Sequence, residues 1–396
     1  MNRRTFVQLA GLPLAGGALL GQTQRPYDIL IQGGEVRDPA RKVRRKADVA
    51  IAGGRIAAIE ERIDSGRAMQ VIDARDTYVV PGLIDLHTHC YFGASGLGID
   101  PDPVGARSGV TTWVDAGTFA YDQIGGFRRF VAVPSKVRVY GFVYLYPSSR
   151  NPDLDPVKYA RSVQKATGEA AANNRDIILG VKLQVGSNMN GRYSLDFLKI
   201  ARELCDQYKL PLMAHISFSP PETDQVMELM RAGDVVTHMY NRHTLGIIEA
   251  DGKVKASVRE ARRRGVLFDV GHGLGSFNFE AARKAIGDGF LPDTISTDIY
   301  NLNLNGPVYD MPTTMSKMLH LGMSLDDILV CTTAAPARIV NRVPMLGSLE
   351  LGAPADVALL AVEDGSFPLV DSQRATVTAK QRIVCKGAVC RGVRIG

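Results

Sequence analysis

The chain of 396 residues is poor in cysteine and aromatic side chains, and it has no apolar run long enough to span a membrane. Its 5 cysteines include no CxxC pair, which excludes the common thiolate zinc sites and a disulfide scaffold. Two basic segments, 40–48 and 259–265, contain no aromatic residue. A formal net charge of +6 does not indicate nucleic-acid binding when no aromatic residues lie among the basic ones. We therefore expect no nucleic acid among the partners.

Cys385 and Cys390 are the only two cysteines that lie close together in the sequence. The stretch RIVCKGAVC predicts a hairpin that turns at Lys386 and Gly387. In that register Cys385 faces Ala388 instead of Cys390. We therefore do not expect a disulfide between them.

Residues 1–24 have the pattern of an export signal. Arg3 and Arg4 precede a run of Gly, Ala and Leu that ends at Leu20 and is too short and glycine-rich for a spanning helix. The paired arginines resemble a twin-arginine signal, which directs export of folded proteins. We expect periplasmic export. No cysteine follows the run, so we expect no stable membrane anchor.

Both ends of the remaining chain predict β-structure. YDILIQGGEV, ADVAIAGGRIAAIEE and MQVIDARDTYVV alternate apolar and polar residues around paired glycines, and DVALLAVE and AKQRIVCKGAVCRGVRI repeat the style near the C-terminus. The pattern predicts a small domain with an antiparallel sheet, a β-sandwich assembled from residues 25–80 and 340–396.

The middle of the chain alternates apolar, strand-sized runs with stretches of helical periodicity. The runs that we expect to be strands are 82–87, 109–117, 137–147, 177–186, 210–217, 234–241, 266–273 and 293–300. Eight such units predict an α/β fold, a (β/α)8 or TIM barrel, over residues 81–339. In that fold the chemistry gathers at the carboxyl ends of the strands.

Residues that bind metals lie near the ends of five predicted strands, and they include four of the 7 histidines. They are His87, His89, Lys182, His215, His238 and Asp298. Side chains two apart on a strand share a face, so His87 and His89 converge, whereas Cys90 points away and is read as a packed thiol. Imidazole and carboxylate without thiolate suit Zn²⁺, with Mn²⁺, Fe²⁺ and Co²⁺ as alternatives.

These motifs resemble the amidohydrolase superfamily: HxH on the first strand, the lysine in GVKLQVG, the histidines in MAHIS and THMYN, and the aspartate in STDIY. The flanking stretches GGRIAAI, VIDARDTYVVPGLIDLHTH and GAPADVALL agree. VGHGLGSFNFEAARKA and GPVYDMPTTMSKML are similar to the branch of dihydroorotase-like deacetylases. The resemblance covers the chain after the signal.

The resemblance implies two divalent metal ions, with zinc preferred. His87, His89 and Asp298 would hold one ion, His215 and His238 the other, and Lys182, as N6-carboxylysine, would bridge both. A bare ammonium beside two dications would be repelled, whereas a carbamate offers each an oxygen. A metal-bridging hydroxide would attack the acyl carbonyl, with Asp298 transferring the proton.

Several further residues are candidates. Gln184 shares the face of Lys182 and could donate to an oxyanion, and His272 could contact substrate, carry a proton or be structural. Asp85 could orient a metal histidine. Tyr240, Asn241 and Arg242 are weaker candidates for substrate contacts.

The substrate is left open by the sequence. Dihydroorotases usually carry an arginine two places after the second histidine, where this chain has Tyr91. Arg242 or Arg192 would then have to bind a carboxylate. We expect hydrolysis of the amide or ester bond of a small acylated acid, with a cyclic amidase or lactonase as the alternative. A third and remote alternative is an inactive barrel that only binds a small molecule. It is remote because every expected metal-ligand position is filled. A homo-oligomer is compatible with the sequence.

Overall fold

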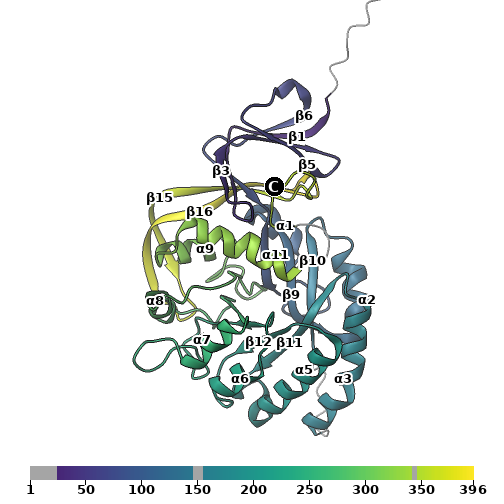
Figure 1. Cartoon of the computed structure of the whole chain (residues 1–396), viewed down its shortest axis with the longest axis vertical. Coiled ribbons are helices and arrows are strands. Elements are labelled where there is room, and N and C mark those ends of the chain that lie inside the picture. Colours follow the sequence, from purple (N-terminus) through teal and green to yellow (C-terminus); the bar gives the residue numbers. More distant parts are fainter. Residues whose placement is uncertain (1–24, 146–154, 341–345) are drawn as a thin grey trace, which may run out of the picture.

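The computed structural model describes residues 25–145, 155–340 and 346–396. The predicted signal, 1–24, lies outside these ranges. Within them, no helix combines the length and the apolar character needed to cross a membrane. The molecule consists of a helix-covered barrel and, at one end of it, a smaller region of sheets (Figure 1).

Seven parallel strands form the barrel sheet, in the order β14-β13-β12-β11-β10-β9-β8. Their bounds are β8 (Leu83–Thr88), β9 (Val110–Ala120), β10 (Arg138–Tyr144), β11 (Ile178–Val185), β12 (Leu212–Ile216), β13 (Val235–Thr237) and β14 (Leu267–Asp269). These apolar runs are buried on both faces, as expected for parallel strands covered by helices. The predicted TIM barrel is confirmed.

The eighth predicted strand, 293–300, closes the barrel without forming a regular strand. It pairs with β14 through Thr294 and with β8 through Ile299, in single parallel bridges. The Asp298 amide donates to the His87 carbonyl at 2.7 Å. Asp298 itself adopts a left-handed conformation, with φ at 48°, which interrupts the ladder at the point where its side chain turns into the barrel.

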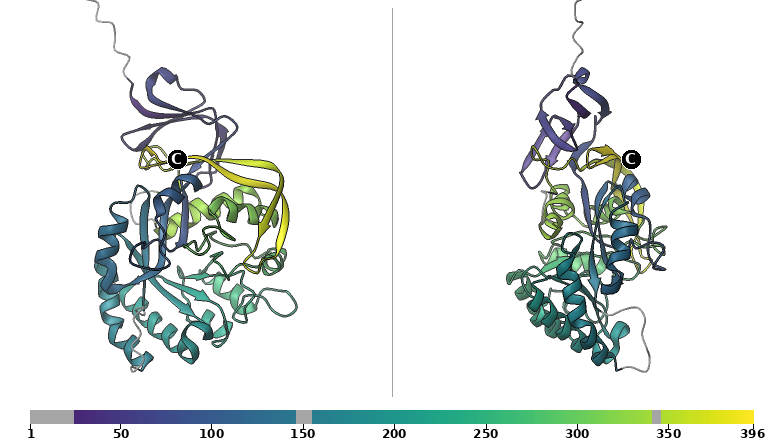
Figure 2. Two further views of the ribbon diagram at one scale, coloured as in Figure 1. Left: turned by 180° about the vertical axis from the view of Figure 1, so that it is seen from behind. Right: turned by 90° about the vertical axis from the view of Figure 1, so that its right-hand side faces the viewer.

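Helices follow most strands and cover the barrel (Figure 2). They are α1 (Pro101–Ser108), α2 (Ile124–Phe127), α3 (Pro156–Asn173), α4 (Ser187–Asn190), α5 (Ser194–Tyr208), α6 (Thr223–Leu229), α7 (Ala256–Arg263), α8 (Phe279–Gly287), α9 (Met311–His320), α10 (Leu325–Leu329) and α11 (Ala335–Val340). Their starts follow the local sequence: the Asp155 side chain accepts from the Lys158 amide, and Pro156 opens α3.

The smaller region contains two sheets, ordered β5-β4-β1-β6 and β17-β16-β15-β7-β2-β3. The strands are β1 (Tyr27–Gln32), β2 (Glu35–Asp38), β3 (Val43–Lys46), β4 (Asp48–Ala52), β5 (Arg55–Glu60), β6 (Ala68–Asp73), β7 (Tyr78–Pro81), β15 (Val357–Val370), β16 (Thr376–Cys390) and β17 (Val393–Arg394). Ile31, Val49, Val79 and Val357 share one apolar cluster, so both chain ends build a β-sandwich, as predicted. The sheets are mixed instead of antiparallel, because β1 pairs with β6, and β2 with β7, in parallel.

The hairpin predicted at Lys386 and Gly387 is wrong. Both residues lie inside β16, which pairs with β15 along its length and turns only at residues 371–375. A register shift opposite Leu359 and Leu360 accommodates the extra residue, so the glycine marks a bulge instead of a turn. All five cysteines are free, in agreement with the absence of an expected disulfide.

Candidate metal centre

A cavity of about 510 Å³ opens at the carboxyl ends of the barrel strands. All six predicted metal ligands line it, and so does Gln184. The ligand side chains come from β8 and the residue after it, from β11 and β12, from the residue after β13 and from the eighth segment. The structure therefore brings together residues that span more than half of the chain.

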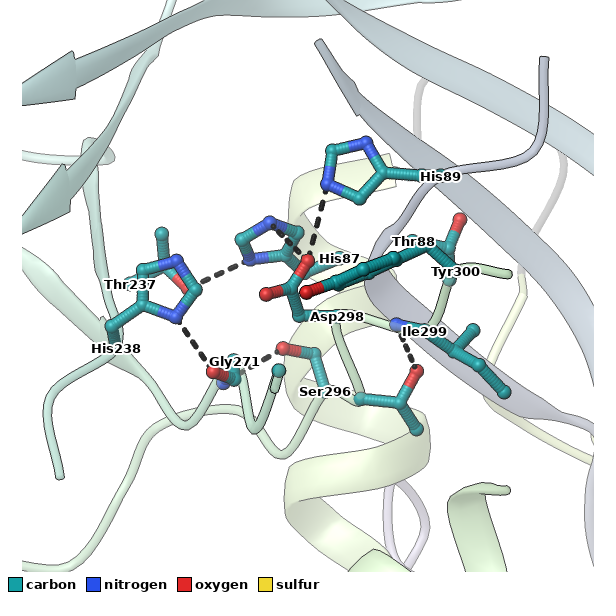
Figure 3. A network of polar contacts seen from close by, with 12 residues as sticks. His87, Thr88, His89, Thr237, His238, Gly271, Ser296, Asp298, Ile299 and Tyr300 are labelled. Atoms are coloured by element: carbon teal, nitrogen blue, oxygen red, sulfur yellow. Dashed lines mark hydrogen bonds and ion pairs between the residues drawn. The ribbon is translucent and has the colours of Figure 1, made fainter. Parts of the chain in front are cut away.

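Asp298 lies between the two histidines of the first strand (Figure 3). Its Oδ1 is 3.3 Å from His87 Nε2 and 3.1 Å from His89 Nε2. Lys182 also reaches this group, with Nζ at 3.0 Å from His87 Nε2. One carboxylate oxygen and three nitrogen atoms thus meet where one cation would bind.

His215 and His238 extend the group. Their ring centroids are 4.2 Å apart, and His238 lies 5.0 Å from the ring of His87. One ligand atom from each of His87, His238 and Asp298 fits within a span of 4.8 Å. These three side chains are therefore close enough to hold one cation together.

Hydrogen bonds behind His87 fix which nitrogen faces the cavity. The Thr237 hydroxyl donates to Asp269 at 2.7 Å, so its oxygen is left to accept from His87 Nδ1 at 2.8 Å. A hydroxyl has one proton, which settles the direction of both bonds. His87 is therefore protonated on Nδ1 and presents the lone pair of Nε2 to the cavity.

His238 is protonated on the same nitrogen, and its hydrogen bond shows this more directly. Its Nδ1 is 2.6 Å from the carbonyl oxygen of Gly271, which can only accept, so Nε2 carries the lone pair. That Nε2 is buried and has no hydrogen-bond partner among the described residues. A buried polar atom without a partner is costly, and an imidazole lone pair aimed at carboxylate and imidazole ligands fits a divalent cation.

Burial keeps the imidazoles neutral. It lowers the pKa of His215 to about 3 and lowers the pKa of His87 and His238 well below the usual range, with Lys182 or a neighbouring histidine adding to the shift. Burial also lowers the pKa of Lys182 to about 8. Neutral imidazole is the form that binds metals, so His87, His215 and His238 are able to bind a cation at neutral pH.

The backbone at the site is strained. His238 and Asp298 have backbone φ angles of 72° and 48°, in a region that residues other than glycine rarely adopt. Glycine makes room beside the ligands: a Cβ on Gly117 would lie 2.8 Å from Lys182, and one on Gly273 would lie 2.3 Å from Asp298 Oδ2. Strain that persists at converging polar residues is typical of functional sites.

Four of the predicted catalytic and substrate residues lie elsewhere. β14 ends at Asp269, and His272 is buried beyond it, with Nε2 at 2.7 Å from Lys317 Nζ and no place in the cavity lining. Tyr240 is buried with its hydroxyl on the Phe290 carbonyl, and Asn241 bonds the His238 carbonyl. Arg242 is exposed in a separate surface hollow. These four residues are absent from the cavity lining, and their predicted roles stay predictions.

Arg192, the other suggested carboxylate partner, is exposed against Tyr193. No arginine lines the cavity within the described ranges. The hydroxyl of Tyr144 donates to Gln184 Oε1 at 3.1 Å, which fixes the orientation of this amide at the cavity wall. Asp85 contacts the backbone amide of His87 instead of its ring, and it mainly binds Thr297.

Sequence reasoning missed the residues behind the ligands: Thr118, which bonds His89 Nδ1 at 2.7 Å, Thr237, Asp115 and Asp269. Asp115 accepts from the amides of Thr118 and Cys90, and so holds the chain after His89. A signal was present, because an aspartate inside an apolar strand such as GVTTWVDAG or VLFDVGHG needs several donors. Cys90 is a buried thiol in the apolar core, as predicted.

Residues 78–394 match the Amidohydrolase family. The chain belongs to this family. A deacetylase from Enterococcus faecalis is 36% identical over 367 residues, which is 90% of this chain and 96% of that protein. A deacetylase from Agrobacterium fabrum is 33% identical over 331 residues, covering 82% of this chain and 81% of its own.

Solved amidohydrolase relatives agree in fold. The crystal structure of an adenine deaminase superposes with a TM-score of 0.85 and 32% identity, covering 93% of this chain and 99% of its own. A dihydroorotase gives the same TM-score with 30% identity, over 93% and 97%. The protein is thus a hydrolase of carbon–nitrogen bonds other than peptide bonds, of the deacetylase and dihydroorotase-like group.

Proposed function

We propose that this amidohydrolase removes the acyl group of a small acylated acid by hydrolysing its amide or ester bond. The observation that carries the proposal is that six ligand-type side chains line one cavity, in which His238 Nε2 lacks a partner among the described residues. The two bacterial relatives named deacetylase support an acetyl group as the acyl part.

The donor set fits two divalent cations, with Zn²⁺ as our choice for imidazole and carboxylate ligands. His87, His89 and Asp298 would hold one, His215 and His238 the other. We propose that Lys182, once its ammonium has lost one proton, attacks CO₂ as the neutral amine, forms an N–C bond and releases a second proton. The buried cation would thereby become a carbamate anion that could contribute to both sites. The bound cations would supply polarisation of the acyl carbonyl and a water nucleophile near neutral pH.

The chain's own residues perform the remaining tasks. The Asp298 carboxylate would accept the proton of the attacking water and return it to the leaving nitrogen or oxygen. The Gln184 amide, with Oε1 held by Tyr144, would direct its N–H group to the oxygen that gains charge. Leu97, Leu274 and Leu302 line the mouth and would contact the apolar part of the substrate.

Metal analysis and an acyl-hydrolysis screen test the proposal. Protein prepared with zinc is expected to hold about two equivalents of metal and to release acetate from one or more N-acetyl-D- or L-amino acids or acetylated 2-hydroxy acids. Less than one equivalent would contradict the metal centre. Turnover of dihydroorotate or of lactones alone would replace deacetylation with the cyclic-amidase or lactonase reading.

Three variants sharpen the result. His238→Asn is expected to lose metal and activity together, whereas His320→Asn, a histidine on α9 away from the cavity, retains both. Gln184→Ala is expected to keep the metal and to lower kcat about 100-fold, as for loss of an oxyanion donor. Full activity of Gln184→Ala would remove Gln184 from the mechanism.

We also propose export by the twin-arginine route, on the basis of Arg3, Arg4 and the apolar run after them. Replacing both arginines by lysine is expected to leave the protein in the cytoplasm, as measured by cell fractionation. Unchanged delivery to the periplasm would contradict the proposal.

A further inference from the structure

The long β15–β16 hairpin reaches from the sandwich to the barrel and ends beside α8 (Figures 1 and 2). We call residues 371–375 the hairpin tip. The tip contacts the segment 272–278, the cavity loop, which follows β14 and contributes Leu274, Gly275 and Ser276 to the cavity lining. An element from the C-terminal end of the chain thus touches a wall of the metal centre.

Ser372 forms hydrogen bonds near both ends of the cavity loop. Its amide donates to the Phe277 carbonyl at 3.0 Å, and its Oγ accepts from the Phe277 amide at 3.1 Å. The Ser372 hydroxyl donates to the Gly273 carbonyl at 3.0 Å. The three residues that line the cavity lie between these two anchor points.

Asp371 joins the tip to the start of α8. Its buried carboxylate uses Oδ1 for the tip amides of Gln373 and Ala375, at 2.8 and 2.9 Å. Oδ2 accepts from the Asn278 side chain and the Phe279 amide, both at 3.1 Å. A carboxylate at this helix start is also favoured by the helix dipole.

Gly273 transmits the contact to Asp298. The backbone of Gly273 lies so close to the carboxylate that a Cβ there would be 2.3 Å from Oδ2. Its amide donates to the Thr297 carbonyl at 2.9 Å, and its carbonyl lies 2.9 Å from His272 Nδ1. The Ser372 hydroxyl is the contact from the sandwich hairpin to this same carbonyl.

We propose that Ser372 and Asp371 are positioning residues: the hairpin tip holds the cavity loop so that Gly273 sets the place of Asp298 and Leu274 to Ser276 form the wall of the substrate cavity. The inference rests on the proposed function for its kinetic consequence. Ser372 is only half-buried, so loss of its hydroxyl leaves the apolar cores in place.

Kinetics of matched variants test the proposal. Ser372→Ala is expected to lower kcat/KM for the acetylated substrate about tenfold, because displacement of a reacting group by a fraction of an ångström is enough for such a loss. Ser372→Thr, which keeps a hydroxyl, is expected to restore it to within about twofold. Gln381→Ala removes a hydrogen bond to Asp364 in the same hairpin, far from the tip, and is expected to leave kcat/KM unchanged.

Hydrogen exchange gives a readout that needs no turnover. Peptides covering Phe277 and Phe279 are expected to exchange faster in Ser372→Ala and Asp371→Asn than in the wild type or Gln381→Ala. Unchanged exchange would overturn the docking. Faster exchange with wild-type kcat/KM in Ser372→Ala, or a loss that Ser372→Thr does not restore, would overturn the positioning role. A wild type inactive on the whole substrate panel contradicts the proposed function instead, and the exchange result still decides the docking.

Discussion

At the scale of single residues, the candidate metal centre depends on side chains that are not themselves predicted ligands. Thr237 lies between His87 Nδ1 and Asp269 and determines which imidazole nitrogen carries the lone pair. The Thr118 hydroxyl lies 2.7 Å from His89 Nδ1 and so contacts the second histidine. Partners of this kind raise the affinity of the ligands that they orient.

Thr237→Val is expected to weaken metal binding about 10- to 100-fold, because the Nδ1 proton of His87 loses its acceptor and Asp269 loses a donor. Competition with a chelator of known affinity measures the change. Thr112→Val is the matched control: Thr112 is also buried in the barrel, but its hydroxyl has no partner among the described residues. Equal affinities of the two variants would contradict the orienting role.

The buried Lys317 is expected to make the stability of the protein depend on pH. Burial lowers the pKa of Lys317 to about 7 from 10.5, against the opposing charges of Asp371 and Asp310, and its Nζ lies on His272 and the Pro307 carbonyl. Between pH values of about 7 and 10.5, Lys317 is protonated in the unfolded chain but not in the folded chain. The free energy of unfolding therefore rises with pH across this range.

Relative to Lys317→Met, the wild type is therefore expected to gain stability as the pH increases through this range. Denaturant unfolding of both proteins at several pH values measures the difference, in which the other titrating groups cancel. Parallel curves would show that the buried amine does not change its protonation on folding.

The residues that line the cavity as candidate ligands could be predicted from the sequence because histidine is rare in this chain and four of the 7 fall at predicted strand ends. Their supporting threonines could not, because threonine is common in strands and the contact of Thr237 with His87 joins β13 to β8 across the barrel. His272 was misplaced because the run VLFDVGHG continues past Asp269, where β14 ends, and periodicity alone does not show the end.

At the scale of elements, the eighth segment closes the barrel with side chains as well as backbone. Asp85 on β8 accepts from the Thr297 hydroxyl at 2.5 Å and from the Thr297 amide at 3.0 Å. Burial raises the pKa of Asp85 to about 7, so these donors compensate a poorly solvated carboxyl group. Asp298 directly follows Thr297 in the chain. The Asp85–Thr297 contact that closes the barrel therefore also holds the backbone next to a predicted metal ligand.

Thr297→Val is expected to lower the free energy of unfolding by about 1–3 kcal/mol, because a buried carboxyl oxygen loses its donor. Thr167→Val on α3 is the control, since the buried hydroxyl of Thr167 has no partner among the described residues and its loss costs little. Chemical denaturation compares the two. A larger effect at Thr167 would contradict the role given to the Asp85–Thr297 contact.

The barrel strands and the β-rich ends followed from apolar periodicity, but two details did not. The left-handed turn at Asp298 depends on where its carboxylate is needed, not on the local pattern STDIY. Lys386 and Gly387 have the composition of a turn, yet β16 continues through them because β15 offers a pairing edge on both sides of the bulge.

At the scale of the whole molecule, metal should couple to stability. The six predicted ligands come from five parts of the barrel, so a cation bound only by the folded chain would stabilise all of them together. Removing metal with a chelator is expected to lower Tm, and zinc at 100 times its Kd is expected to restore about 2.7 kcal/mol for each bound cation.

Thermal unfolding with and without chelator measures this effect, and His238→Asn should show little response to zinc. An identical Tm for treated and untreated wild-type protein would contradict a structural contribution of the metal. The proposed boundaries of the barrel, 81–339, and of the sandwich parts, 25–80 and 340–396, stay a prediction that limited proteolysis can address.

Strand β7 pairs with β2 on one side and with β15 on the other, and it leads directly into β8 and the first metal histidine. During synthesis the ribosome releases β7 long before Val357 of β15 exists. A nascent chain therefore carries one open strand edge next to its first metal histidine until translation is nearly complete. Chains that stall before that point would expose this edge to chaperones or to one another, so premature termination is expected to yield aggregates instead of a smaller working barrel.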